Sequence, residues 1–424
     1  MQLVAIGAQD IHLTGNPQIT YFKTVYRQHT NFAIESIAQT FSNGTFDFGV
    51  TNLNCRIARN GDLIYRMYMT CELPALDSTF IAGFSGTPSQ LSWSDSIGYI
   101  LFNDISIYIG GQLIDKHYGT WLDIWSELSE ITTDKLWPSI IKKENPREIE
   151  AYSANIKKKE LYIPFNFWFN KNPGSALPLV ALQYHDIEVR FTTRALNELI
   201  ISDNTRTTVS GSISNSKLYV DYIYLDKNER RRFVNSKHEY LIEQLQLNTK
   251  TLSDGDNKVD LQFNHPVKEL IFTSINSNRA SQSSLTNIPS HTSTSPNSWN
   301  LWGSYSTTNP LNLTAKYDFF ENLDILFNGN SRVSNRGPQY YRMVQPIQHH
   351  SRFPDNYIYI YSFALKPEEF QPSGTCNFSK LSSVQLKFSG VPSQTAGDLE
   401  LNIYAINYNV LKINNGMGGL IYTN

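Results

Sequence analysis

The sequence predicts an all-β protein built from a duplicated β-sandwich, and three observations support this fold class. Aromatic residues make up 13% of the 424 residues and charged residues only 17%. This composition suits pleated, half-buried sheets, where aromatic and β-branched side chains pack well. Turn signals separate short runs of alternating apolar and polar residues. Several of these runs also recur later in the chain in the same order, which indicates an internal repeat.

The predicted strands are bounded by glycine-containing turns. Arg56–Leu73 contains two extended runs around Asn60-Gly61, a dipeptide that favours a type I′ hairpin turn. The alternating run Ile105–Asp115 contains a second such signal at Gly110-Gly111. Short strands at this spacing are typical of sandwiches and barrels. Further strands are predicted at Tyr184–Thr193, Leu218–Leu225, Leu241–Leu247, Val259–Phe263, Leu270–Thr273, Tyr357–Leu365, Val384–Phe388 and Leu399–Asn407.

Few helices are predicted. Asn16-Pro17 resembles an N-cap followed by proline at the first helical position, which predicts a short helix with Ile19 and Phe22 on one face. Gly119–Ile131 carries an apolar stripe at helical spacing, which predicts a second helix. We expect this helix to pack on a sheet edge, although its two tryptophans could instead anchor a contact between subunits. The stripe consists of Trp121, Ile124, Trp125 and Leu128.

The internal repeat has four landmarks, which keep their order although their offsets differ. Loop insertions explain the differences, and four landmarks in order are more than chance similarity among strands would give. The pairs are Ile34 with Ile242, offset by 208 residues, Gly111 with Gly329, offset by 218, Phe191 with Phe388, offset by 197, and Val220 with Leu401, offset by 181.

The repeat predicts a division near Lys227–His238, a charged stretch without strand alternation. We expect an amino-terminal segment at 1–30, a first sandwich at 31–227, a linker at about 228–237 and a second sandwich at 238–424. Two stretches rich in Ser, Thr and Asn are expected to be surface loops, because long segments without strand signals are unusual inside compact domains. They are Ser78–Ser94 and Thr273–Leu313.

Composition also limits the function classes. The net charge of −2 lacks the basic footprint of a nucleic-acid binder, so direct nucleic-acid contact is not expected. Three widely spaced cysteines argue against a disulfide framework and against a cysteine-based zinc site. The first residues lack a basic region before Asp10, so no signal peptide is expected. No apolar run is long enough to predict a transmembrane helix.

The sequence offers no motif for catalysis. The nine histidines form neither an HExxH motif nor a His-x-His pair, and no phosphate-binding or nucleophile-elbow glycine pattern occurs. Side chains of adjacent residues such as His349-His350, or His185-Asp186 on a strand, point in different directions. We therefore predict that the chain is not an enzyme, and that it has no catalytic residue, no cofactor-binding residue and no metal ligand.

Three N-x-S/T sequons, at Asn43, Asn312 and Asn377, are the candidate glycosylation sites. Such triplets often arise by chance, and a chain without a signal peptide does not normally meet the secretory machinery.

Nine segments of the chain together carry a resemblance to a known family. The first is Gly7–Ile37, and the others follow in order at Arg59–Ile64, Ile109–Tyr118, Asn172–His185, Val220–Asp226, His238–Gln246, Phe263–Leu270, Tyr361–Ser379 and Leu401–Tyr422. These segments resemble, in family order, those of the major capsid proteins of nucleocytoplasmic large DNA viruses, in particular the type found in chlorella viruses. Gly7–Ile37 is similar to the amino-terminal signature of that family.

The resemblance implies a double jelly roll, that is, two tandem eight-stranded jelly rolls with a few short helices. It implies a homotrimeric capsomer of pseudo-hexagonal outline, which contacts neighbouring capsomers and tiles the icosahedral shell of a virion assembled in the host cytoplasm. The segment Asn16–Phe32 would lie at the inner base of the capsomer, facing minor capsid proteins and the viral internal membrane. Algal members often carry glycans at atypical positions, so the sequons need not be the modified sites.

Two alternatives remain open at this point. The chain could be a minor capsid paralogue, used at special lattice positions. It could also be a glycan-binding or glycan-cleaving double jelly-roll protein. The second alternative requires aromatic and carboxylate side chains gathered in one cleft, or a metal site.

Overall fold

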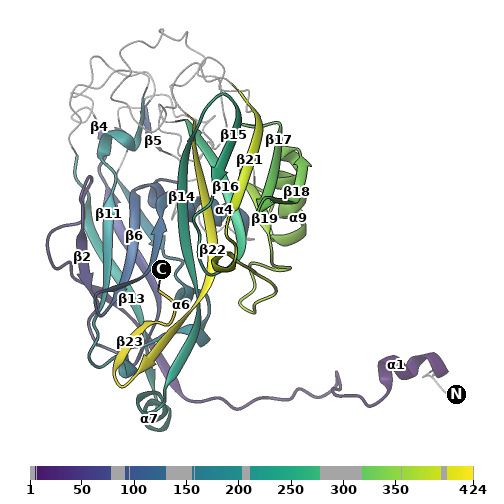
Figure 1. Cartoon of the computed structure of the whole chain (residues 1–424). Helices are drawn as coiled ribbons and strands as arrows, with labels where there is room; N and C mark the ends of the chain where they lie inside the picture. Colours follow the sequence, from purple (N-terminus) through teal and green to yellow (C-terminus); the bar gives the residue numbers. More distant parts are fainter. Residues whose placement is uncertain are drawn as a thin grey trace.

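The computed structural model describes residue 5 and residues 7–77, 91–94, 96–129, 155–156, 158–202, 211–276, 318–354, 356–392 and 399–423. Within these ranges two β-sandwiches stand side by side, and an amino-terminal arm extends away from them (Figure 1). Most of the two predicted surface loops, residues 78–90 and 277–313, lie outside the described residues.

The first sandwich consists of two antiparallel sheets. One sheet has the order β1 (Phe32–Gln39), β13 (Ser214–Leu225), β3 (Leu63–Leu73), with β9 (Lys159–Pro164) and β10 (Leu177–Pro178) both paired to β3. The other has the order β2 (Leu53–Arg56), β11 (Ile187–Thr193), β6 (Phe102–Ile109), β7 (Gln112–Tyr118). Two short pairs lie beside them: β4 (Leu76–Asp77) with β8 (Asn155–Ile156), and β5 (Leu91–Trp93) with β12 (Ile200–Ser202).

The second sandwich repeats this arrangement strand for strand. Its larger sheet has the order β14 (His238–Leu252), β22 (Leu399–Asn414), β16 (Pro266–Asn276), with β19 (Tyr359–Ser362) and β20 (Cys376–Asn377) sharing β16, and β23 (Met417–Leu420) paired to β22. Its smaller sheet has the order β15 (Gly255–Asp260), β21 (Val384–Val391), β17 (Asn322–Phe327), β18 (Asn330–Arg336).

Each sandwich therefore has eight strand positions in jelly-roll order, with the sixth position along the chain split between two short strands in both. The predicted double jelly roll is confirmed. Short helices lie between the strands, namely η1 (Ala8–Asp10), α1 (Ile11–Thr14), α3 (Ile97–Ile100), α4 (Gly119–Ser129), α6 (Trp168–Lys171), η2 (Pro173–Ser175), η3 (Leu179–Ala181), η4 (Leu196–Glu198), α7 (Lys227–Asn235), η6 (Tyr340–Val344), α9 (Gln345–His349) and η7 (Phe378–Lys380).

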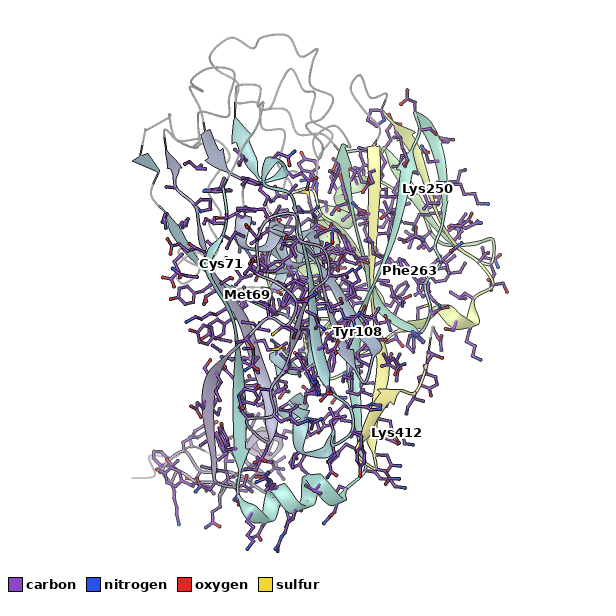
Figure 2. The ribbon with its side chains drawn as sticks, turned by 90° about the vertical axis from the view of Figure 1, so that its left-hand side faces the viewer. Met69, Cys71, Tyr108, Lys250, Phe263 and Lys412 are labelled. Atoms are coloured by element: carbon purple, nitrogen blue, oxygen red, sulfur yellow. The ribbon has the colours of Figure 1, made fainter. Side chains whose placement is uncertain are left out.

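Each sandwich buries its own aromatic core between its two sheets. Met69 and Cys71 contribute to the core of the first, and Phe263 to the core of the second (Figure 2). Phe191 packs edge-on against Phe46 in the first sandwich, with ring centroids 6.3 Å apart. Such ring contacts add geometric specificity to the burial of apolar area, so the two sheets of each sandwich are held at a defined spacing.

Two of the repeat landmarks agree with the observed strand register. Phe191 pairs with Ile105 in the first sandwich, and Phe388 pairs with Leu323 in the second. Phe388 follows Phe191 by 197 residues and Leu323 follows Ile105 by 218, which are the two offsets predicted from the sequence. The turns agree as well. Gly110-Gly111 and Asn328-Gly329 all have positive φ, as a type I′ hairpin requires.

The other two landmarks fall on equivalent strands but not in a common register. Ile34 on β1 pairs with Ile223, whereas Ile242 on β14 pairs with Asn409. The two partner residues, Ile223 and Asn409, are therefore 186 residues apart. This offset is five residues larger than the 181 predicted from Val220 and Leu401. A strand with a simple alternating pattern matches another such strand almost equally well when it is shifted along it. Comparing the two sequences therefore does not fix which residues are equivalent.

The hairpin predicted at Asn60-Gly61 is wrong. Neither residue has a positive φ, and the flanking strands β2 and β3 belong to different sheets. Gly61 serves a different purpose, because a Cβ atom there would lie only 2.7 Å from Cβ of Tyr222. The glycine lets the chain cross from one sheet to the other against a buried tyrosine. Strand β15 also lies at Gly255–Asp260 rather than at the predicted Val259–Phe263.

Of the two predicted helices, one is confirmed and one is wrong. Helix α4 forms at Gly119–Ser129 with its apolar stripe buried. The helix predicted after Asn16-Pro17 is absent from the described arm, where α1 ends at Thr14 and Asn16 has a φ of +51°. Isolated short helices are marginally stable in water, and the arm offers Ile19 and Phe22 no surface to pack on.

Helix α7 (Lys227–Asn235) connects β13 to β14, where the sequence predicts the linker. The carboxylate of Asp226 caps it by accepting hydrogen bonds from the backbone N–H groups of Asn228 and Glu229. Arg230 forms a 3.0 Å ion pair with Asp62 of the first sandwich. The proposed boundaries at 31–227 and 238–424 remain a prediction.

Candidate functional site

Helix α4 lies between the two sandwiches, on the outer face of the larger sheet of the second. The ring of Trp121 is centred 5.3 Å from that of Tyr404 on β22, and the hydroxyl groups of Thr120 and Tyr404 are 2.8 Å apart. Alternate residues of β22 point in opposite directions. Ile403 therefore belongs to the core of the second sandwich, whereas Tyr404 packs against the first. The tryptophan stripe was expected on a sheet edge and instead joins two sandwiches.

Strand β7 of the first sandwich continues this seam along strand β14. The carboxylate of Asp115 accepts a 3.0 Å hydrogen bond from the backbone N–H of Leu245 and lies 3.0 Å from Nε2 of His117. The side-chain amide of Gln244 donates to the carbonyl of Ile114. Polar contacts of this kind fix the register of one sandwich against the other. A buried polar group whose hydrogen-bond partner is displaced loses its contact with water without compensation, so other registers are disfavoured.

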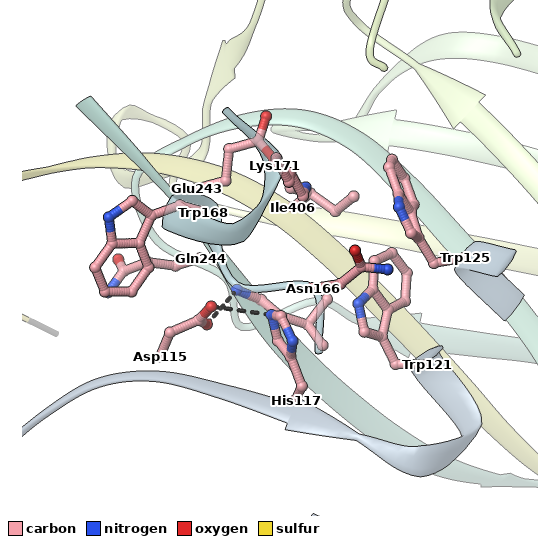
Figure 3. A pocket seen from close by; sticks show the side chains of 11 residues that line it. Asp115, His117, Trp121, Trp125, Asn166, Trp168, Lys171, Glu243, Gln244 and Ile406 are labelled. Atoms are coloured by element: carbon pink, nitrogen blue, oxygen red, sulfur yellow. Dashed lines mark hydrogen bonds and ion pairs between the residues drawn. The ribbon is translucent and has the colours of Figure 1, made fainter. Parts of the chain in front are cut away.

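A pocket opens on this seam (Figure 3). Three tryptophans, Trp121, Trp125 and Trp168, line it together with the carboxylates of Asp115 and Glu243. This is the combination that the glycan-binding alternative requires. However, the cavity measures only about 20 Å³, enough for one water molecule, whereas ligand pockets usually measure several hundred. The pocket is a packing feature of the seam and cannot admit a sugar ring.

Glu243 lies between two lysines at the edge of this pocket. Its carboxylate is 2.6 Å from Nζ of Lys171 and 2.5 Å from Nζ of Lys268, which also donates to the carbonyl of Pro367. Burial opposes ionisation of Glu243, but the two ammonium groups outweigh it and lower its pKa to about 2. Burial also lowers the pKa of Lys268, whose side chain is only 1% exposed. The lysine remains paired only because Glu243 is ionised.

A second buried ionic group involves His350, which follows α9. Its side chain is fully buried, with Nε2 at 3.0 Å from Glu269 and Nδ1 at 3.0 Å from Glu368. Burial by itself would lower the pKa of His350, but the two carboxylates outweigh burial and raise it to about 9. The ring of Trp125 packs edge-on against His350, so this cluster also connects to the seam.

The raised pKa of His350 predicts a loss of stability at alkaline pH. Its contribution is fully present below the ordinary value of 6.5 and is lost as pH rises through about 9. We expect the free energy of unfolding of the native chain to fall between about pH 7 and about pH 10 by more than that of His350→Gln. Urea unfolding at both pH values measures the difference. Equal losses for the two proteins would contradict the assignment.

The predicted site residues have different surroundings. Asn43 is exposed, but its side chain donates to the carbonyl of Asn52 and accepts from the N–H of Asn54. Asn377 is exposed and its side-chain oxygen accepts from the N–H of Ser379. Asn312 lies outside the described residues. Glycosylation at all three positions stays a prediction.

The sequence did not indicate the seam or its two ionic groups. One weak signal exists, because Lys268 and Glu269 interrupt the otherwise apolar run Pro266–Phe272 of β16, where both side chains are almost fully buried. Charged residues are rarely buried unless they are paired, so such a strand implies partners elsewhere in the chain. The sequence cannot name these partners, which are Glu243 and His350.

The amino-terminal arm is the other surface that stands out. Among its described residues, Ile11, Leu13, Ile19, Tyr21, Phe22, Val25 and Tyr26 are all more than 65% exposed. A concentration of exposed apolar side chains on one segment marks an interaction surface, because such side chains gain free energy when they are removed from water. Figure 1 shows that the arm runs away from both sandwiches.

Two further features are absent from the described part of the chain, a membrane-spanning helix and a cluster of metal ligands. Within that part, no helix is long and apolar enough to cross a membrane. In the same part of the chain, no group of three or more His, Cys, Asp or Glu side chains is arranged to hold a metal ion.

Two sandwiches with the same strand order, joined by a closed seam, define a double jelly-roll protein. Comparison with known families gives the class a name. A model described as "Major capsid protein N-terminus" matches residues 20–226, and one described as "Large eukaryotic DNA virus major capsid protein" matches residues 229–419. The chain belongs to the major capsid proteins of large DNA viruses and is a structural protein of the virion capsid.

Individual relatives agree over the full length. The major capsid protein of Pyramimonas orientalis virus is 40% identical, covering 100% of this chain and 99% of the relative. The major capsid protein of Paramecium bursaria Chlorella virus 1 is 37% identical with the same coverage. A solved structure of PBCV-1 VP54, fitted into a reconstruction of the virophage Sputnik, matches with a TM-score of 0.76 and 33% identity, covering 96% of this chain and 100% of VP54.

Proposed function

We propose that the chain forms a homotrimeric capsomer of pseudo-hexagonal outline, which contacts neighbouring capsomers and tiles an icosahedral shell. The observation that supports this most strongly is the identical strand order of the two sandwiches. One chain supplies two nearly equivalent wall segments, so three chains supply six. The seam through α4 and β7 holds the two segments of one chain in a fixed relation. The proposed role is structural rather than catalytic, in keeping with the capsid-protein names of the relatives.

The amino-terminal arm supports the finer part of the proposal. Its exposed apolar side chains suit a segment that is covered after assembly, at the inner base of the capsomer. Minor capsid proteins and the region near the internal membrane are the proposed neighbours, and the host cytoplasm is the proposed place of assembly. No direct contact with nucleic acid is part of this role.

The trimer makes a simple prediction. We expect sedimentation velocity of the purified chain at micromolar concentration to show a species of three times 48.4 kDa. Obligate interfaces bury several thousand Å² and are stable at such concentrations. A chain that remains monomeric across this range would contradict the proposal.

A minor capsid paralogue at special lattice positions is the remaining alternative within the family. Copy number separates the two roles, because the principal shell protein greatly outnumbers a special-position paralogue. Quantitative mass spectrometry of purified virions, with the total capsid protein as reference, measures this number. A low copy number would favour the paralogue without affecting the trimer.

A further inference from the structure

We propose that a second pocket on the seam binds a small organic carboxylate whose apolar body is about the size of one ring. This pocket adjoins the smaller pocket of Figure 3 and shares Trp168, Lys171 and Glu243 with it. Its volume is about 150 Å³. A cavity of this volume holds one benzene ring, and it is smaller than the pockets that bind drug-sized ligands. The inference does not depend on the proposed trimer.

Both sandwiches contribute walls to the second pocket. Helix α6 of the first sandwich supplies Trp168, and strands β14 and β22 of the second supply Leu241 and Tyr408. Phe370, in the segment between β19 and β20, also lines the pocket. Trp168 and Tyr408 are buried, but Leu241 and Phe370 are 39% and 50% exposed, so the walls extend from the interior to the surface. Three aromatic rings and a leucine side chain suit a flat apolar ligand.

The carboxylates that line the second pocket already have partners. The two oxygens of Glu243 lie 2.5 Å and 2.6 Å from lysine ammonium groups. One oxygen of Glu368 lies 3.0 Å from Nδ1 of His350, and the other accepts a 2.5 Å hydrogen bond from the hydroxyl group of Ser351. An amine, or a sugar with several hydroxyl groups, needs acceptors and would have to displace these partners. Separating buried ionic partners is costly, so ligands of both kinds are disfavoured.

Two hydrogen-bond donors at the pocket can serve a ligand. The ammonium group of Lys171 has three N–H groups, and its side chain is 31% exposed although it pairs with Glu243. The indole N–H of Trp168 is buried, and no group in the described part of the chain accepts a hydrogen bond from it. A buried donor without an acceptor is unfavourable, and a ligand oxygen beside Trp168 removes that cost. The pocket therefore suits a ligand that accepts hydrogen bonds.

The charge around Glu243 favours an anionic acceptor. The ammonium groups of Lys171 and Lys268 share the single carboxylate of Glu243, which leaves one positive charge in excess at this place. Lys171 is the accessible one of the two, because the side chain of Lys268 is only 1% exposed. Glu368 repels an anion, but its ion pair with His350 offsets part of this repulsion. A carboxylate beside Lys171 forms a charge-assisted hydrogen bond, which a neutral oxygen forms less strongly.

Three probes with the same ring test the charge of the ligand. Benzoate is anionic, benzyl alcohol is neutral and benzylamine is cationic at pH 7. We expect isothermal titration calorimetry of the purified full chain to show saturable binding of benzoate, one molecule per chain, with a dissociation constant on the order of 1 mM. Benzyl alcohol and benzylamine should each bind at least about tenfold more weakly.

A fourth probe distinguishes two sources of the carboxylate. N-acetylphenylalanine has the same ring but carries its carboxylate as a peptide terminus does. Binding at least as tight as that of benzoate would identify the carboxyl terminus of a protein as the source. Weaker binding would identify a free organic acid. Both outcomes support the site.

Two substitutions locate the binding. Lys171→Met removes the accessible ammonium group but leaves Glu243 paired with Lys268, so the far-UV circular dichroism spectrum should not change. We expect this variant to bind benzoate at least about tenfold more weakly and to lose the preference for benzoate over benzyl alcohol. Phe370→Ala removes a half-exposed wall and should weaken the binding of both probes. Lys412→Met is the matched control, because Lys412 is 47% exposed and does not line the pocket.

Several results would overturn the inference. They are a lack of saturable benzoate binding, equal affinities for benzoate and benzylamine, or a Lys171→Met variant that binds benzoate as the native chain does. If Lys171→Met does not fold, Phe370→Ala decides, because an unchanged affinity for benzoate would place the binding elsewhere. Each of these results would leave the proposed trimer intact, since sedimentation tests it separately.

Discussion

Replacing Glu243 with Gln is expected to lower the free energy of unfolding by about 3–5 kcal/mol, because it leaves the buried ammonium group of Lys268 without its carboxylate. The side chain of Lys268 is 1% exposed and lies 2.5 Å from Glu243. Removing one partner of a buried ion pair costs more than the pair contributes, since the remaining charge stays out of water. Urea unfolding followed by circular dichroism measures the change, at one protein concentration because subunit association adds to apparent stability.

A matched control lies on the same strand as Glu243. Glu239 on β14 pairs with Lys412 on β22 at 3.4 Å, but their side chains are 59% and 47% exposed. Glu239→Gln should therefore change stability by less than about 1 kcal/mol. Adding Lys268→Met to Glu243→Gln should restore most of the loss, because the unpaired charge is then removed. A Glu243→Gln variant as stable as the control would contradict the network.

Replacing Trp121 with Ala should cost a similar amount, about 3–5 kcal/mol, because it removes a large buried ring and leaves a cavity. Trp121 is 4% exposed and contacts Trp125 and Tyr404, with ring centroids at 5.6 Å and 5.3 Å. The cavity opens between the two sandwiches, so we also expect them to unfold less cooperatively. Differential scanning calorimetry should then show a broadened or divided transition.

The control for this substitution is an aromatic residue without contacts of this kind. Tyr26 in the amino-terminal arm is 85% exposed, and Tyr26→Ala should change the stability of the isolated chain by less than about 0.5 kcal/mol. A Trp121→Ala variant that loses less than about 1 kcal/mol and retains one sharp transition would show that the seam does not couple the sandwiches.

Much of the fold was predictable because its signals are local. The hairpins at Gly110-Gly111 and Asn328-Gly329 depend on positive φ at adjacent residues, which few side chains tolerate. The helix at Gly119–Ser129 depends on apolar spacing within one segment. Asn60-Gly61 carries the same kind of local signal and misled the prediction, because the packing of Tyr222 against Gly61 determines the conformation there.

The candidate site was less predictable, because its partners are far apart in the chain. The aromatic composition and the helical stripe indicated that Trp121 and Trp125 would be buried, but not against what. The sequence also identified His349-His350 as adjacent and divergent. In the structure, His350 lies between two carboxylates. Nδ1 of His349 instead lies 3.1 Å from the carbonyl oxygen of Leu365.

Local sequence patterns are sufficient to predict that this protein is β-rich, that its sandwich is duplicated, and that α4 carries a buried stripe. These properties follow from periodicity and turn chemistry, which act over a few residues. The sheet that each strand joins and the surfaces that form the seam depend on contacts between distant parts of the chain. Thr120 and Tyr404 are 284 positions apart, and no local pattern encodes a contact of that range. Such contacts form because two separately folded faces are complementary in shape, charge and hydrogen bonding.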